Sequence, residues 1–92
     1  MDKLTQTEIA EWLAGNNGWK QQDDKWIVKA YRFPTFPEAI AFVNEVATIA
    51  ERLNHHPMIA IDYRVVTIRL TTWSAGGLTA LDLDSAAQYD RV

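Results

Sequence analysis

The sequence contains no cysteine, and this excludes both disulfide bonds and zinc sites built from thiolates. It has no long run of Lys or Arg, and its net charge is −3. Because binding to a phosphate backbone depends on a basic face, we expect no nucleic-acid partner. No segment approaches the roughly 18 apolar residues of a membrane span, and residues 1–5 lack the apolar stretch of a signal peptide. We therefore expect a cytoplasmic protein that does not associate with membranes.

The chain is also short. Its 92 residues correspond to one domain, which we expect to span residues 1–92. Hydrophobic residues make up 48% of the sequence and charged residues 23%, as in an ordinary soluble globular protein. A domain of this size buries only about 60–65% of its unfolded surface, so its core is thin and a partner surface would stabilise it.

Three pairs of residues have the spacing of helix caps, in which a hydroxyl and an acidic side chain satisfy free N–H groups at a helix start. The pairs are Thr5 with Glu8, Thr35 with Glu38, and Thr79 with Asp82. They predict a helix after residue 5, a helix from 36 to about 54, and a helix over 80–89. A polar turn at 21–24 followed by aromatic and β-branched residues predicts two strands within 18–33. Apolar alternation predicts strands over 58–63 and 65–72, and each pair should form a hairpin. The order α-β-β-α-β-β-α indicates an α+β fold, with a four-stranded antiparallel sheet and three helices packed on one face.

The predicted helix over residues 36–53 has a wide apolar surface made of two adjoining stripes. The first holds Ala39, Phe42, Val46, Ile49 and Leu53, and the second holds Ile40, Val43, Ala47 and Ala50. A helix on the surface of a single domain needs only one such stripe. The second stripe therefore indicates either a deeply buried central helix or contact with another subunit. Together with the thin core, it leads us to expect a homodimer or homotetramer formed through this helix.

Only two histidines occur, and they are adjacent, at His55 and His56. They precede Pro57, which disfavours helical geometry at His56, so the two rings should diverge. Histidine readily exchanges protons near neutral pH, so the pair is a candidate for acid–base chemistry. The alternative is a solvated polar cap at the helix end. No metal site is expected, because neighbouring histidines rarely face one ion and no third soft ligand is visible.

The two histidines belong to a longer pattern of spaced residues. It runs Glu51, then His55-His56-Pro57 after three residues, Tyr63 after five more, Trp73 after nine more, and Asp82 after eight more. An acidic residue, His-His-Pro, an aromatic residue, His or Trp, and Asp at these intervals are typical of the pterin-4a-carbinolamine dehydratase family, which this chain resembles. Flanking segments such as Gly76-Gly77-Leu78-Thr79 resemble the family too, and the similarity covers nearly the whole chain.

This resemblance implies an enzyme, a 4a-hydroxytetrahydrobiopterin dehydratase. Such a hydro-lyase removes the 4a-hydroxyl of a tetrahydropterin as water and leaves a quinonoid dihydropterin. The reaction recycles a tetrahydrobiopterin-type cofactor, and the enzyme itself needs no cofactor because the pterin is its substrate. By resemblance, His55 is an acid in the elimination and His56 mainly binds the pterin. Glu51 precedes His55 by four residues on the same helix face, where it would orient the ring.

Three further residues match family positions that would bind the substrate, namely Trp73, Asp82 and Tyr63. The best-known members have a third histidine where this chain has Trp73. Because an indole cannot exchange a proton near neutral pH, Trp73 would stack on the pterin or form a wall of its site. Each residue has a structural alternative, which is packing for Trp73 and Tyr63 and helix capping for Asp82.

Two other interpretations stay open. Some family members resemble dimerisation cofactors of transcription factors, which implies a coactivator-like module that binds a protein partner through the long helix. A pterin-binding protein without turnover is the third possibility, since Trp73 replaces a proton donor.

Overall fold

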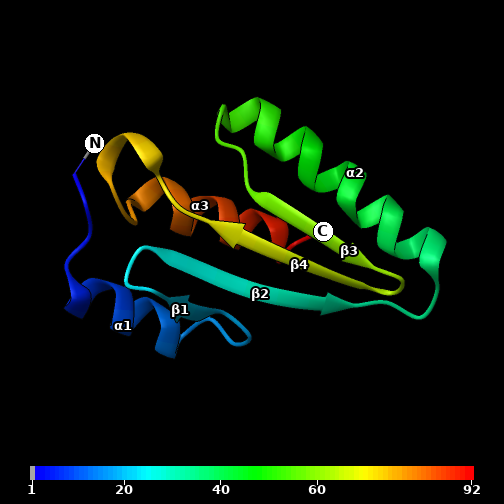
Figure 1. The fold of residues 1–92 in the computed structure, drawn as a ribbon, viewed down its shortest axis with the longest axis horizontal. Helices are drawn as coiled ribbons and strands as arrows, with labels where there is room; N and C mark the ends of the chain where they lie inside the picture. The colour runs from blue at the N-terminus through cyan, green and yellow to red at the C-terminus, as the bar shows by residue number, and fades with distance from the viewer. Residues whose placement is uncertain (1) are drawn as a thin grey trace.

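The computed structural model describes residues 2–92 (Figure 1). Its main elements follow the predicted order, with the bounds α1 Gln6–Ala14, β1 Lys20–Gln22, β2 Trp26–Arg32, α2 Phe36–Leu53, β3 Met58–Asp62, β4 Val65–Leu70 and α3 Ala80–Tyr89. A short 3₁₀ helix that the sequence did not predict, η1 Trp73–Ala75, follows β4. None of the helices in this described part of the chain is long and apolar enough to cross a membrane.

The four strands form one antiparallel sheet in the order β1-β2-β4-β3. The turns of both hairpins use left-handed backbone, with φ of 52° and 59° at Asp23 and Asp24 and 53° at Tyr63. In the second hairpin Met58 pairs with Arg69, so β3 begins where β4 ends. This register places the segment after α2 beside the segment after β4, at one end of the sheet.

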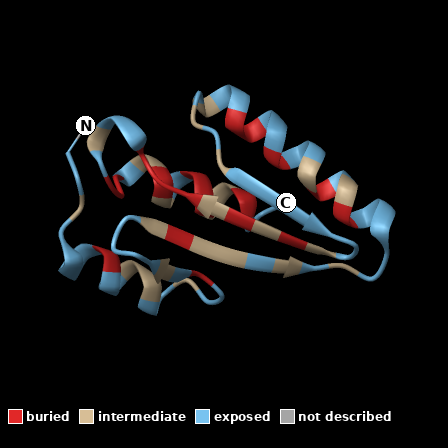
Figure 2. Ribbon diagram, in the orientation of Figure 1, coloured by how far each residue is buried: buried red, intermediate tan, exposed pale blue. Residues whose placement is uncertain are grey.

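All three helices pack on one face of the sheet, which confirms the predicted α+β architecture. Along β4 every second residue is buried, at Val66, Ile68 and Leu70. The core cluster adds residues from every helix: Ile9 from α1, Phe42 and Val46 from α2, and Ala86 and Tyr89 from α3. Figure 2 shows buried residues recurring along α2, α3 and β4, whereas β3 is exposed along its whole length.

The long helix α2 has the hydroxyl half of the predicted cap, and no hydrogen bond from the Glu38 side chain to the Thr35 N–H is found among the described residues. The Thr35 side chain accepts the N–H of Glu38, and Pro37 lies in the first turn, where its missing N–H costs nothing. The first apolar stripe is buried at Ala39, Phe42, Val46 and Ile49 and half-buried at Leu53. The second is buried at Ala50, half-buried at Ile40 and Val43, and exposed at Ala47. One chain therefore covers the first stripe well and the second stripe only in part.

Candidate active site

The long helix ends where the two histidines begin. Asn54, the residue that caps α2, has a left-handed backbone with φ of 51°. The next N–H, of His55, donates to the carbonyl of Ala50 at 3.0 Å. This turn takes the chain out of the helix, and the rings of His55 and His56 contact different carboxylates. The two rings thus diverge, as the position of Pro57 predicts.

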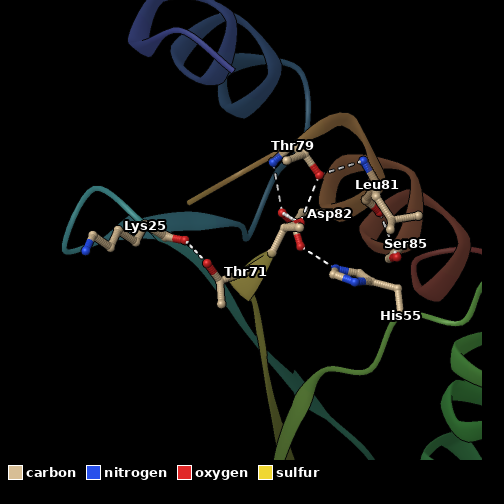
Figure 3. Close-up of polar contacts among 8 residues, drawn as sticks. Lys25, His55, Thr71, Thr79, Leu81, Asp82 and Ser85 are labelled. Carbon is tan, nitrogen blue, oxygen red and sulfur yellow. Dashed lines mark hydrogen bonds and ion pairs between the residues drawn. The ribbon is translucent and has the colours of Figure 1, made fainter. Parts of the chain in front are cut away.

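The ring of His55 points toward the start of α3, where it meets Asp82 (Figure 3). Nε2 of His55 lies 2.5 Å from Oδ1 of Asp82. The His55 side chain is 10% exposed and that of Asp82 is 0% exposed. A carboxylate without access to water must find its hydrogen-bond donors in the protein. His55 is therefore one of the groups that make this buried carboxylate stable.

Asp82 also caps α3. Its Oδ2 accepts the backbone N–H of Thr79 at 2.9 Å, and the two residues form a capping box. The hydroxyl of Thr72 donates to the same oxygen at 2.8 Å. The capping role is therefore present, and it occupies Oδ2 while Oδ1 faces His55. Capping and contact with the histidine use different oxygens of one carboxylate, so they are compatible.

These contacts assign the hydrogen of the His55 ring. An ionised carboxylate can only accept hydrogen bonds, so Nε2 carries the hydrogen in the neutral ring and donates it to Asp82. Nδ1 then holds a lone pair, and within residues 2–92 no hydrogen bond to it is found. When the ring is protonated, Nδ1 becomes the donor and Asp82 stabilises the positive charge. His55 therefore has one nitrogen held by Asp82 and one without a hydrogen-bond partner among the described residues.

His56 points away from the buried pair. Its Nε2 contacts the carboxylate of Glu51, and both side chains are exposed. We expected Glu51 to orient His55, and this expectation is wrong. Because Asn54 leaves the helix, His55 does not continue the face of Glu51 and turns toward α3 instead. An exposed pair of this kind adds little to stability.

Trp73 lies at the same end of the sheet as the histidines, because β4 ends beside the start of β3. The residue is 77% exposed, and its ring meets the ring of Trp26 at a centroid distance of 5.3 Å and an angle of 84°. Such an edge-to-face contact favours one orientation of the exposed indole. Trp73 thus packs on Trp26 and still has an exposed surface that a ligand can contact.

The structure does not bring Tyr63 to the histidines within one chain. Tyr63 lies in the turn between β3 and β4, where its exposed ring stacks on Phe36 at a centroid distance of 6.4 Å. The five residues of β3 separate this turn from the segment that holds His56, a span of about 16 Å at 3.3 Å per residue. Within one chain, Tyr63 therefore packs on Phe36 and does not reach the histidines.

We also compared the candidate residues with possible metal ligands and with a hollow over the sheet. Within residues 2–92, no three His, Asp or Glu side chains gather as ligands for a metal ion. A hollow of about 500 Å³ lies over the sheet and is lined by residues that include Lys20, Val28 and Thr67. None of the six candidate site residues lines this hollow. His55 and Asp82 instead meet where the end of α2 comes close to the start of α3, outside this hollow.

Two residues of this arrangement were not singled out in the sequence. Thr72 contacts Asp82 from the end of β4, and Trp26 supports Trp73 from the start of β2. Neither has a periodic or capping signal, because both act across elements that are distant in the sequence. The only local indication is that Thr72 directly precedes Trp73 in the family pattern.

Comparison with known proteins points to one family. The family model described as Pterin 4 alpha carbinolamine dehydratase matches residues 2–92. A relative from Roseiflexus sp. (strain RS-1), named "Putative pterin-4-alpha-carbinolamine dehydratase", is 48% identical over 90 residues, which cover 98% of this chain and 96% of the relative. A relative of the same name from Sulfurisphaera tokodaii is 42% identical over 92 residues, covering 100% and 98% of the two chains.

Solved structures share the fold. The crystal structure of a transcriptional coactivator/pterin dehydratase from Brucella melitensis superposes with a TM-score of 0.93 at 33% identity, covering 98% of this chain and 97% of that one. A pterin dehydratase-like protein identified as a RuBisCO assembly factor in the α-carboxysome has a TM-score of 0.71 at 23% identity, with 82% and 88% covered. The second likeness concerns the fold alone. On the family match and these relatives, the chain belongs to the pterin-4a-carbinolamine dehydratase family.

Proposed function

We propose that this chain dehydrates a 4a-hydroxytetrahydropterin to the quinonoid dihydropterin and water, as a hydro-lyase with His55 as the acid–base group. The observation that carries the proposal is the contact of His55 with buried Asp82, which fixes Nε2 and leaves Nδ1 free. Membership of the dehydratase family supplies the substrate class. The setting we propose is cytoplasmic recycling of a tetrahydrobiopterin-type cofactor.

The elimination has one leaving group and one proton to remove. The C4a–O bond breaks as the protonated His55 donates the hydrogen of Nδ1 to the departing hydroxyl, which leaves as water. The N5–H bond gives its electron pair to a new N5–C4a double bond, and the released proton passes to the neutral Nδ1. His55 is then protonated again, so acid and base steps balance on one ring. Asp82 stabilises the imidazolium at both ends of the cycle.

His56, Glu51 and Trp73 are the groups we propose for holding the pterin. His56 and Glu51 are exposed and paired, so their polar atoms can exchange this contact for one with the ligand. Trp73 offers a large exposed ring at the same end of the sheet. A pterin is flat and aromatic, so stacking on an indole and hydrogen bonding at its rim suit it. Because Trp73 cannot donate a proton to the leaving group, all proton transfer in this proposal depends on His55.

Stopped-flow loss of a 4a-carbinolamine tests the proposal. The wild-type chain should accelerate dehydration by about 10²–10⁴-fold over the spontaneous rate, the usual scale of general acid–base catalysis. His55→Gln should lose this acceleration, because its amide can still donate to Asp82 but cannot exchange a proton. Equal unfolding temperatures of the two proteins would show that the fold is intact. A wild-type rate equal to the spontaneous rate would disprove the proposed activity.

A second candidate function is protein binding through an apolar surface. Phe36, Ile59 and Ile61 are exposed although they are large and apolar, and the second stripe of α2 is only partly covered. The Brucella melitensis structure is described as a transcriptional coactivator as well as a dehydratase. We propose that this surface of α2 and β3 forms a homodimer or homotetramer and that a protein partner can use the same helix.

Sedimentation velocity at micromolar concentration tests this assembly. The wild-type chain should sediment as an oligomer, and Val43→Asp should sediment as a monomer because it places a charge in the second stripe. His55→Gln is the matched control, since it should abolish dehydration and leave the assembly unchanged. If the wild-type chain is only monomeric, the proposed interface is wrong. The dehydratase hypothesis would then still be decided by the kinetic test.

A further inference from the structure

A continuous series of hydrogen bonds links the backbone of α3 to the ring of His55. The N–H of Leu81 donates to Oγ1 of Thr79 at 3.3 Å, and this oxygen lies 2.8 Å from Oγ1 of Thr72. Oγ1 of Thr72 lies 2.8 Å from Oδ2 of Asp82, whose Oδ1 contacts His55. Thr72, Thr79 and Asp82 are all buried, so water does not compete for these contacts.

The direction of this series follows from chemistry. The backbone N–H of Leu81 can only donate, so Oγ1 of Thr79 accepts there. A hydroxyl has one hydrogen, and the carboxylate of Asp82 has none, so Thr72 must give its hydrogen to Asp82. Thr79 must then give its own hydrogen to Thr72. Every donor in the series points toward the carboxylate.

The hydroxyl of Thr72 is not needed to satisfy its own backbone at the end of β4. The backbone of Thr72 is already satisfied by Gly77, with N–H to carbonyl distances of 3.1 and 3.3 Å in the two directions. Thr72 also lies outside α3 and is not part of its capping box. In this arrangement the hydroxyl accepts the hydrogen of Thr79 and donates its own hydrogen to Asp82.

We propose that Thr72 is a positioning residue of the active site, whose hydroxyl keeps Asp82 an acceptor so that His55 retains its hydrogen on Nε2 and presents Nδ1 to the pterin. The proposal rests on the proposed dehydratase function. A buried carboxylate that loses a donor is destabilised as an anion. In the protonated ring, the hydrogen between Nε2 and Oδ1, which lie 2.5 Å apart, would then shift toward Oδ1, and this leaves a neutral ring with its hydrogen on Nδ1. The ring would lose the charge support that it needs as an acid.

The test compares two neighbouring threonines. Thr71 and Thr72 are both 6% exposed, but the hydroxyl of Thr71 donates to the carbonyl of Lys25 at 2.5 Å, away from Asp82 (Figure 3). Thr71→Val and Thr72→Val therefore remove the same kind of buried group from adjacent positions. The readouts are the ring ¹⁵N signals of His55 in the unliganded protein and the kcat and KM of dehydration. In a His56→Gln background the histidine signals come from His55 alone, since the chain has only two histidines.

Thr72→Val should move the Nε2 signal toward the unprotonated type and lower kcat by about 10-fold with KM nearly unchanged, the scale of one hydrogen bond to a charged group. Thr72→Ser should restore both, and Thr71→Val should leave both unchanged. If Thr72→Val does not fold, Thr72→Cys, whose thiol is a weak donor, should give a smaller change in the same direction.

Unchanged ¹⁵N signals in the Thr72 variants, or equal changes in Thr71→Val, would overturn the proposal. A wild type without activity would defeat the dehydratase function alone, because the ¹⁵N comparison needs no pterin.

Discussion

A carboxylate lies at each end of helix α3, the buried Asp82 near its start and the partly exposed Asp90 just after its end, and the two have different partners. Asp82 near its start accepts from Thr72, from the N–H of Thr79 and from His55. Asp90, which follows its last residue, accepts from three side chains: Trp19 Nε1 at 2.9 Å, Lys29 Nζ at 2.9 Å and the Tyr31 hydroxyl at 2.5 Å. Both carboxylates are well supplied with donors, so the number of contacts does not distinguish them.

The chemistry of the donors distinguishes the two ends. Burial raises the pKa of Asp90, but its hydrogen bonds from Tyr31, Lys29 and Trp19 outweigh burial and lower the pKa below its ordinary value of 3.8. Burial, and then the contact with Asp90, raises the pKa of Tyr31 far above 10.0. The raised pKa of Tyr31 keeps its hydrogen in place near neutral pH, and an indole such as Trp19 is a donor only. Asp90 therefore fastens α3 to Trp19 and β2, whereas Asp82 holds a ring that can exchange a proton.

The strongest test of this difference is Asp82→Asn. The amide keeps an oxygen for Thr79 and Thr72 but turns an N–H₂ group toward His55, so Nε2 becomes the acceptor and the hydrogen moves to Nδ1. The ring then lacks both its free lone pair and a counter-charge for the imidazolium. We expect kcat for dehydration to fall by about 100-fold or more in stopped-flow measurements. Retention of kcat within a few-fold would show that Asp82 is a helix cap and nothing else.

The sequence predicted the elements better than the contacts between them. The Thr–acid pairs predicted where α1, α2 and α3 begin, because capping is a local interaction between residues three apart. Alternation predicted the second hairpin, and aromatic and β-branched residues after a polar turn predicted the first. These signals need no knowledge of tertiary structure. The α+β fold was accordingly predictable from one sequence.

The contacts within the site depend on tertiary placement. A single left-handed residue, Asn54, decides that Glu51 meets His56 rather than His55. The register of β3 with β4 decides that Trp73 lies at the histidine end and Tyr63 at the other. The interval between His55 and Asp82 matches the family pattern, but spacing alone does not say that the two side chains touch. Geometry across elements is therefore what the structure adds.

The smaller test is Asp90→Asn, which should affect stability and leave catalysis unchanged. Its three donors would face an amide that accepts through one oxygen only and carries no charge. We expect a loss of about 2 kcal/mol in the free energy of unfolding by urea at pH 7, the scale of hydrogen bonds to a charged group. The kcat for dehydration should stay within about twofold of wild type when both proteins are folded. A loss of activity comparable to that of Asp82→Asn would remove the distinction between the two ends of α3.

The difference between wild type and Asp90→Asn should also depend on pH, and this is the smallest effect expected. Because the pKa of Asp90 is lowered in the folded chain, the unfolded chain binds its proton first as the pH falls. The stability from the ionised carboxylate is therefore fully present well above pH 3.8 and is lost progressively below it, as the pH approaches the folded pKa. Urea unfolding of the two proteins should give a constant difference between about pH 5 and pH 7 and a shrinking one in more acid buffer. A difference that persists unchanged at acid pH would mean that geometry at the end of α3, and not the charge of Asp90, holds the helix to Trp19 and β2.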